Sequence, residues 1–567
     1  MYIRGTTNAA PYARGLPVVG GTLSLALQGA DFIHTCRKRY GDIVRVSLGG
    51  QGMTYLFGPD AMKLFFSASD DQIGFRPATE HFTGRVFGLP SHLFFPHHTA
   101  LLQGLRAQLT HAQLPLHGHA LLSSMQLESD RILTSSGKAD LMCSIKDTLF
   151  PAAVKSIFGA AFLQCHGIAQ LQKAFFAFEE GFELAASPVP HLFQPSFCKA
   201  RQTLLQAFRV SWAAGHFGDT VVGLLLQEVP ELHGIAPHVL LALLWASLAN
   251  TIPATFWALA FLLLPDNQEH KQQILLVLQS MPAQASHACL ADARAQQQTS
   301  PDGRLPAAIG SSEAVAVGTA TAAPGFDAAT HAKVAEAKGP ATSEAAAPAL
   351  DTLSTPPDAR GPYSNDGLVT QACDRSSLLA GCVAEAVRVR APGVAVRMAT
   401  CDLAMPLAPG QCVHISKGDM LAVSPYESHH DPRFFQPHPA RYDPTRGGLR
   451  CPGSSLHEVP GISGIAGLVF GGGRYRCPGR FFAEMEVALT VAFFLTHFEM
   501  QLVSCQDSDG YHGSPQALDS TKQHKPMGSA FPESGDPHGL LPRAETRRQV
   551  GIRWPKAPCE VTCKRVQ

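Results

Sequence analysis

The sequence predicts a mainly α-helical protein with small β-sheets, an α+β fold. Apolar residues recur at three- and four-residue spacing through most of residues 98–227, which is typical of amphipathic helices. The uncharged stretch Val239–Leu264 is long and apolar enough for a buried helix. Near the N-terminus, the strand-like runs Ile43–Leu48 and Met53–Phe57 are joined by a glycine-rich turn, which predicts a β-hairpin.

Composition excludes several classes of function. The chain has 567 residues and a formal net charge of zero, and no long basic run occurs, so nothing supports nucleic-acid binding. Its 14 cysteines are scattered without the spacing of a zinc site, and we expect them to be reduced. The segment Met1–Arg14 lacks the continuous apolar core of a signal peptide.

The stretch Val239–Leu264 is also long enough to cross a bilayer. Polar side chains and a helix-breaking residue stand at its centre, among them Ser247, Asn250, Thr251 and Pro253. We therefore interpret it as a buried core helix of a large globular protein.

Composition shifts divide the chain. Residues 1–21 form a proline- and glycine-rich hinge, and residues 22–281 form the first part of the main domain. Residues 282–366 are rich in Ala, Ser, Thr, Gly and Pro, and they carry too few large apolar groups to offset their ordering entropy, which predicts a disordered insertion. The main domain resumes over 367–567, with an extended polar loop at 507–542.

The run Phe470–Gly479 carries the most specific motif, F-x-x-G-x-x-x-C-x-G, and an apolar helix begins at Arg480. Its glycines let the backbone lie flat against a ligand and adopt torsions that side chains forbid. We expect Arg474, Arg476 and the helix N-terminus to lower the pKa of the Cys477 thiol. A thiolate held in this way suits a haem iron.

This pattern resembles the haem-thiolate monooxygenases of the cytochrome P-450 superfamily. The resemblance implies the cytochrome P-450 fold, in which haem b (iron protoporphyrin IX) lies between a long distal helix and the cysteine loop. It makes Cys477 the iron ligand. The residues that it places around the cofactor are Phe470, Gly473, Arg476 and Gly479.

The same resemblance assigns roles to charged residues elsewhere. Glu385 and Arg388 form an E-x-x-R pair on one helix face, and they would join Arg446 in a buried structural network. Arg397 would reach a haem propionate, the alternative being an edge-strand arginine in solvent. Arg106 is a second propionate candidate, although the Trp usual four residues earlier is absent.

The predicted distal helix, Leu241–Leu264, departs from the superfamily. Most of its monooxygenases carry an acid and a hydroxyl there for proton delivery, but this chain has Ala249 and Asn250 at the matching positions. Asn250 can donate and accept hydrogen bonds, so we expect it, with Ala246 and Thr251, to act at the oxygen-binding face. The alternative is an asparagine that only caps or kinks the helix.

That departure resembles one branch of the superfamily. The runs Trp245–Trp257 and Ala384–Val394 look like the sterol and oxysterol (24-hydroxycholesterol) 7α-hydroxylases, a branch that also contains prostacyclin synthase. The resemblance implies insertion of one oxygen atom of O2 into a hydrophobic substrate, by 7α ring hydroxylation of a sterol or oxysterol. Electrons would come from NADPH through an NADPH-dependent P-450 reductase.

Two other functions stay open at this point. A haem-thiolate isomerase or dehydratase of fatty-acid peroxides needs neither O2 nor a reductase, and the Ala249-Asn250 replacement is compatible with it. A non-catalytic haem-binding protein is the other. The resemblance implies the cytosolic face of the endoplasmic reticulum membrane, reached through a missing anchor or through a peripheral contact of the apolar loop Pro188–Phe197.

Overall fold

The computed structural model describes residues 7–10, 20–48, 51–132, 137–187, 189–281, 363–408, 411–446, 465–503, 539–545 and 550–566. By their contacts, residues 1–290 and 361–567 form one unit, and the second unit, 291–360, lies outside the described residues. Most of the predicted 282–366 insertion, of the 507–542 loop and of the 1–21 hinge also lies outside them, so these boundaries stay predictions.

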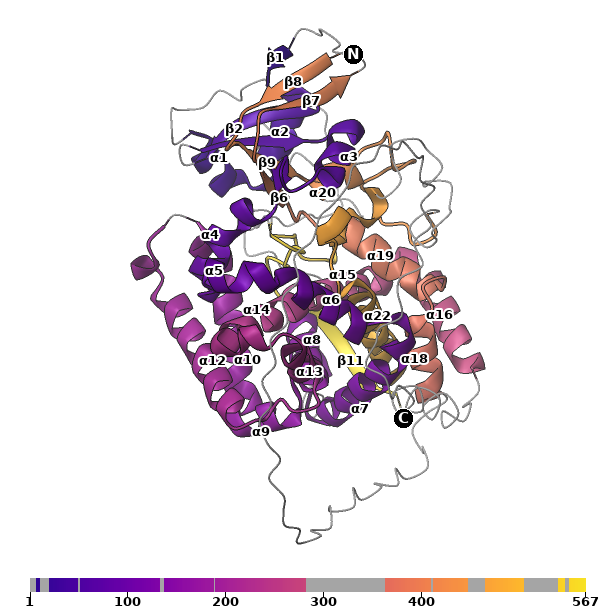
Figure 1. Ribbon diagram of the computed structural model, residues 1–567. Coiled ribbons are helices and arrows are strands. Elements are labelled where there is room, and N and C mark those ends of the chain that lie inside the picture. Colours follow the sequence, from indigo (N-terminus) through magenta and orange to yellow (C-terminus); the bar gives the residue numbers. More distant parts are fainter. Residues whose placement is uncertain are drawn as a thin grey trace, which may run out of the picture. The chain divides into compact units, whose positions relative to one another are not determined.

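Helices dominate the described residues, which confirms the α+β prediction (Figure 1). The helices before the long gap are α1 Gly20–Gln28, α2 Ala30–Tyr40, α3 Pro59–Ser67, α4 Arg76–Phe87, α5 Ser91–Phe94, α6 His98–Gln108, α7 Leu114–Ile132, α8 Leu141–Phe158, α9 Ala160–His166, α10 Ile168–Glu180, α11 Phe182–Ala186, α12 Pro195–Ala213, α13 Val221–Glu228, α14 Ala236–Leu248, α15 Thr251–Leu263 and α16 Gln268–Ser280. Those after it are α18 Asn365–Cys373, α19 Leu378–Arg390, α20 Pro425–His429 and α22 Arg480–His497.

The predicted hairpin is present and belongs to a five-stranded sheet. Its two strands are antiparallel, with Ile43 opposite Leu56 and Leu48 opposite Gln51. The second strand pairs in parallel with a strand from the C-terminal half, so the sheet joins distant parts of the chain. The order is β2 Ile43–Leu48, β3 Gln51–Leu56, β9 Met420–Val423, β6 Ala395–Ala399 and β4 Ile73–Gly74.

Two further sheets have three strands each. One comprises β1 Thr7–Ala9, β8 Gln411–Ile415 and β7 Leu403–Ala408. The other comprises β10 Phe498–Leu502, β11 Glu560–Arg565 and β5 Lys138–Asp140. Strand β10 follows α22 directly, so this last sheet fixes the C-terminal end of the helix that begins at the cysteine loop.

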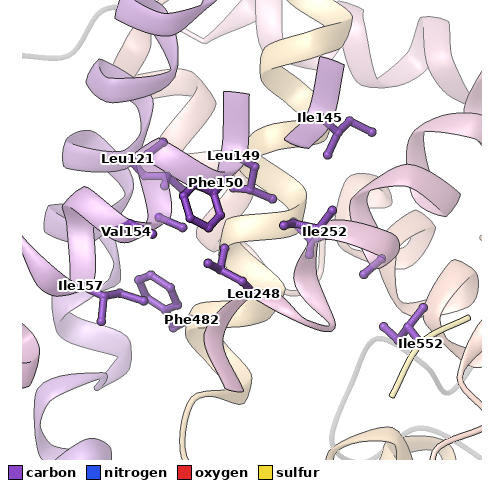
Figure 2. Close-up of a cluster of buried hydrophobic side chains, with 14 of the residues drawn as sticks. Leu121, Ile145, Leu149, Phe150, Val154, Ile157, Leu248, Ile252, Phe482 and Ile552 are labelled. Carbon is purple, nitrogen blue, oxygen red and sulfur yellow. The ribbon is translucent and has the colours of Figure 1, made fainter. Parts of the chain in front are cut away.

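The largest hydrophobic core surrounds α15, every residue of which is buried. Figure 2 shows how neighbouring helices contribute to it: Leu149 and Phe150 of α8 lie close to Leu248 of α14, Ile252 of α15 and Phe482 of α22. Burial of each such side chain contributes roughly 1.5–3 kcal/mol. The core therefore holds the distal helix against the helix that follows the cysteine loop.

The predicted distal helix is interrupted. Instead of running unbroken over 241–264, it divides into α14, which ends at Leu248, and α15, which begins at Thr251. Pro253 has no N–H, so the carbonyl of Ala249 does not receive the backbone hydrogen bond that residue 253 would donate in a regular helix. The same region, Pro230–Leu263, is long and apolar enough to cross a membrane, but 67% of its most apolar window is buried, as in a core helix.

Candidate active site

The cysteine loop and the distal helix meet at one cavity of about 750 Å³. Its walls come from α14, α15, α19, α22, the cysteine loop and the C-terminal segment 550–552. Most lining side chains are apolar, as a binding site for a hydrophobic molecule requires. Seven of the predicted site residues line this cavity: Ala246, Asn250, Thr251, Phe470, Arg476, Cys477 and Gly479.

The cysteine loop needs glycine at two positions for its own backbone conformation and packing. Gly471 and Gly473 have φ values of +70° and +61°, in the left-handed region that favours glycine. A Cβ on Gly473 would lie 2.2 Å from the carbonyl oxygen of Phe66. Gly473 thus packs against α3 and is not among the residues that line the cavity, while the Cys477 N–H donates to the Phe470 carbonyl at 2.9 Å and closes the loop.

The predicted lowering of the Cys477 thiol pKa is wrong for the polypeptide alone. Burial raises the pKa of Cys477, and the charge of Glu484 adds to the rise. The N–H of Gly479 and the guanidinium groups of Arg480 and Arg476 oppose it without overcoming it. A bound metal cation supplies the additional positive charge that favours a thiolate.

Arg474 does not act on the sulfur as we expected. It pairs with Asp70, with Nη1 2.8 Å from Oδ2, and the hydroxyl of Tyr475 donates to the same oxygen at 2.7 Å. These two contacts fasten the cysteine loop to the turn between α3 and β4. Arg474 therefore has a positioning role.

Arg397 is buried rather than placed in solvent. Its guanidinium lies over the rings of Tyr475, Phe65 and Phe75, at 4.8, 5.2 and 5.8 Å from their centroids. Burial lowers its pKa, and its Nε has no hydrogen-bond partner among the described residues. A buried cation without a carboxylate partner, next to the cysteine loop, is suited to receive an anionic group such as a haem propionate.

Arg106 lies at the protein surface, where Nη2 donates to the carbonyl of Arg474 at 3.0 Å. It therefore contacts the cysteine loop without lining the cavity. The sequence had no signal for the first residue of α6, His98, whose ring stacks on those of Phe75 and Tyr475 with centroid distances of 5.6 and 6.1 Å. That stack unites three distant segments, so no local pattern reveals it.

Glu385, Arg388 and Arg446 come together in the core. Arg388 donates from Nε and Nη2 to the two oxygens of Glu385 at 2.8 and 2.7 Å, and Arg446 donates from Nε to Oε1 at 3.3 Å. The arginines also donate to backbone carbonyls, those of Pro439 at 2.6 Å and Gln436 at 3.0 Å. The network thereby holds the loop after α20, and loss of one member leaves a buried charge unpaired.

The distal-helix break places Asn250 against the C-terminal segment. Its Oδ1 accepts a hydrogen bond from the Ile552 N–H at 3.0 Å, and its side chain makes no capping bond to α15. The Oδ1 acceptor is therefore engaged, and the Nδ2 donor is the group left for a ligand. Thr251 donates from Oγ1 to the Ser247 carbonyl at 2.9 Å.

Sequence reasoning missed two acidic residues of the site on α22. Glu484 accepts a hydrogen bond from Arg375 Nε at 2.9 Å, and both side chains line the cavity. Glu486 is fully buried and lines the cavity too. A readable signal was its place at the start of the apolar run Val487–Leu495, because a carboxylate there enters the core and carboxylates are almost never fully buried without a partner.

Together these residues fit a haem. The thiol of Cys477 is a ligand type for haem iron, the cavity beside it is apolar, and Arg397 is a buried cation with an orphaned nitrogen. Among the described residues, no group of three or more His, Cys, Asp and Glu side chains could hold a metal ion by itself. In a bound haem the porphyrin would carry the iron, with Cys477 as the ligand from the protein.

Comparison with known proteins agrees with this geometry. The family model described as Cytochrome P450 matches residues 10–212 and 369–523. The chain is 22% identical to the 24-hydroxycholesterol 7-alpha-hydroxylase of Mus musculus over 97% of this chain and 91% of that protein. It is 24% identical to the 7-alpha-hydroxycholest-4-en-3-one 12-alpha-hydroxylase of Homo sapiens, over 88% of each chain. A shorter match, 32% identical over 22% of this chain and 24% of that protein, is to the sterol 14-demethylase of Arabidopsis thaliana.

Proposed function

This chain belongs to the cytochrome P450 family and is a haem monooxygenase, and from that premise we propose that it hydroxylates the ring system of a sterol or oxysterol at the 7α position. The observation that carries the substrate class is the alignment of sterol hydroxylases along most of the chain. The 7α position rests on one group of these relatives, because the 12-alpha-hydroxylases, at 24% identity over 86–88% of the chain, are similar to it as well.

The protein's own residues would bind and orient the two molecules. Cys477 would hold the iron, and Arg397 would pair with a propionate. A bound haem supplies the O2 activation and the oxygen transfer. The apolar lining of Leu243, Val383 and Ile552 would exclude water and receive the sterol skeleton, while the Asn250 Nδ2 would be a donor for an oxygen atom of the substrate or for a water.

The competing function is rearrangement of a fatty-acid hydroperoxide. One observation favours it: residues 249 and 250 of the distal helix, an alanine and an asparagine, offer no acid for proton delivery. Such a reaction would consume neither O2 nor reducing equivalents. The test must therefore separate the two reactions by their co-substrates.

The deciding experiment incubates the haem-loaded protein with 24-hydroxycholesterol, 7α-hydroxycholest-4-en-3-one or a fatty-acid hydroperoxide, each with and without NADPH, reductase and O2. We expect a 7α-hydroxylated product from the first sterol, dependent on all three additions. A 12α-hydroxylated product would show that the enzyme hydroxylates the sterol at the 12α position instead. Turnover of the hydroperoxide without NADPH would establish the competing function. Cys477→Ser is the control, because it removes the thiolate.

Family membership implies that a redox partner delivers electrons, and we propose that this partner is an NADPH-dependent P-450 reductase at the endoplasmic reticulum membrane. The loop between α11 and α12 supports a peripheral membrane contact. Leu192 and Phe193 there are 85% and 71% exposed. We expect Leu192→Ser with Phe193→Ser to weaken binding to phospholipid vesicles, as measured by co-sedimentation, and unchanged binding would contradict the contact.

A further inference from the structure

The carboxyl group of Glu486 stands out among the buried polar groups. The residue lies on α22, two turns after the cysteine loop, and its side chain is fully buried. Neither carboxyl oxygen makes a well-formed hydrogen bond with any described residue. An ionised carboxylate in such surroundings is strongly unfavourable, so the group is expected to be neutral.

The surroundings of Glu486 also favour a neutral carboxyl group. Burial raises the pKa of Glu486 to about 8, and the hydroxyl of Thr251 is close enough to oppose that rise. The protonated carboxyl is a donor, whereas Thr251 Oγ1 already donates its own hydrogen to Ser247 and keeps lone pairs free to accept. The two groups are therefore complementary, and α22 packs against α15 where they meet.

The monooxygenase reaction requires a proton source in this cavity. Conversion of R–H and O2 to R–OH and water consumes two electrons and two protons. Ala249 has no titratable group and Asn250 is an amide, so this part of the distal helix supplies no acid.

The other titratable side chains that line the cavity fill this need less well. Arg375, Arg476 and Arg480 stay charged, and Cys477 is the iron ligand. Burial raises the pKa of Glu484 as well, but Arg375 donates a hydrogen bond to its carboxylate and opposes that rise. Among the described residues of the cavity, Glu486 is the acid without an ion-pair partner.

We propose that Glu486, in its protonated form, donates a hydrogen bond to Thr251 Oγ1 and is the proton donor for the distal side of the cavity. In the transfer, the Glu486 O–H bond breaks as its proton moves to Thr251 Oγ1. The hydrogen that Thr251 now gives to Ser247 passes to a water in the cavity, and a solvent proton restores the carboxyl group. This inference rests on the monooxygenase reaction and is independent of which substrate is hydroxylated.

The first test uses infrared spectroscopy on the purified protein at neutral pH, with no turnover. The carbonyl stretch of a protonated carboxyl should be present in the wild type, absent in Glu486→Gln and retained in Glu486→Asp, which keeps the acid. A wild type without that band would overturn the proposal. Because this readout needs neither substrate nor reductase, it does not depend on the proposed sterol activity.

The second test compares turnover in Glu486→Gln, Glu486→Asp and Thr251→Val. We expect Glu486→Gln to lower kcat by at least about tenfold, as loss of a general acid does. KM should not change, and more NADPH should be diverted to peroxide. The Asp variant should recover part of kcat, and the double variant Glu486→Gln with Thr251→Val should lose no more than the worse single variant.

Unchanged kcat and coupling in Glu486→Gln would refute the proposal. If Glu486→Gln fails to bind haem, the Thr251→Val variant tests the proposal instead. It removes the hydroxyl that accepts the proton of Glu486, and it should show the same diversion of electrons from NADPH to peroxide. NADPH oxidation and peroxide release can be followed with any substrate that stimulates turnover, so an error about the sterol leaves this test intact.

Discussion

The side-chain oxygen of Asn250 accepts a hydrogen bond from the backbone N–H of Ile552 at 3.0 Å, which ties the break in the distal helix to the C-terminal segment. Asn250 and Gly551 line the cavity with Cys477 and also a second cavity of about 400 Å³. The same segment is fastened nearby, where Trp257 Nε1 donates to the Arg553 carbonyl at 2.6 Å. The wall between the two cavities therefore depends on Asn250.

Breaking this contact from either side should have linked effects. A Cβ on Gly551, which has φ of +77°, would lie 2.2 Å from Asn250 Oδ1, so Gly551→Ala strains the backbone and displaces the amide. Asn250→Ala removes the acceptor, at a cost of about 1–3 kcal/mol. We expect the double variant to lose less unfolding free energy than the two single variants lose together, as measured by denaturant unfolding. Amide hydrogen exchange at residues 550–552 should be faster in each variant than in the wild type. Strict additivity would show that the contact does not couple the two segments.

The buried charge network should be far more sensitive than a surface pair of similar spacing. Glu385→Gln leaves Arg388 and Arg446 without their carboxylate, and we expect a loss of about 3–5 kcal/mol in unfolding free energy, with impaired haem uptake. The control is Glu80→Gln, which removes the exposed pair of Arg76 and Glu80 and should cost no more than about 0.5 kcal/mol. Equal losses in both variants would contradict the network's structural role.

Glu486 should make stability depend on pH. Its pKa is raised from 4.5 to about 8 in the folded protein, so its contribution to stability is complete below the unfolded pKa and is lost as pH rises through the folded one. Since one pKa unit corresponds to about 1.4 kcal/mol, the loss is a few kcal/mol at most. Urea unfolding at several pH values should show this decline in the wild type and a flatter profile in Glu486→Gln.

The exposed Glu80 provides a contrast of opposite sign. A hydrogen bond from Ser91 lowers its pKa, so any stability that it contributes is present above its unfolded pKa and is lost as pH falls. Glu80→Gln should therefore leave the decline between about pH 5 and pH 8 unchanged. If Glu80→Gln also flattened the dependence of stability on pH, the decline could not be attributed to Glu486.

Arg397 and Arg106 should differ as cofactor contacts. Because Arg397 is buried with an orphaned nitrogen, Arg397→Gln should speed haem loss by about tenfold or more, the effect of one charge-assisted hydrogen bond. Arg397→Lys keeps the charge but loses the stack on the aromatic rings, and we expect an intermediate rate. The exposed Arg106 should matter little. The rate of haem transfer to an apo-globin acceptor can be measured for Arg397→Gln, Arg397→Lys and Arg106→Gln. Similar rates for Arg397→Gln and the wild type would show that Arg397 does not contact the haem.

Local patterns in the sequence were sufficient to predict the fold class, the β-hairpin and the cysteine loop. Each depends on residues a few positions apart: the helical spacing of apolar residues over 98–227, the two strand-like runs joined by a glycine-rich turn between Ile43 and Phe57, and the spacing from Phe470 to Gly479. The same short patterns gave the resemblance to the family, and the match of the family model confirmed it. The sequence also showed that the distal helix lacks its acid at Ala249 and Asn250.

The tertiary structure decided the chemistry around those residues. Asn250 and Ile552 are 302 positions apart, Arg397 meets Phe65 and Tyr475 from three segments, and Gly473 packs against Phe66 of α3. The direction of the Cys477 pKa shift and the neutral state expected of Glu486 both follow from burial. Burial and hydrogen-bond partners depend on which segments fold together, and residue spacing along the chain does not record them.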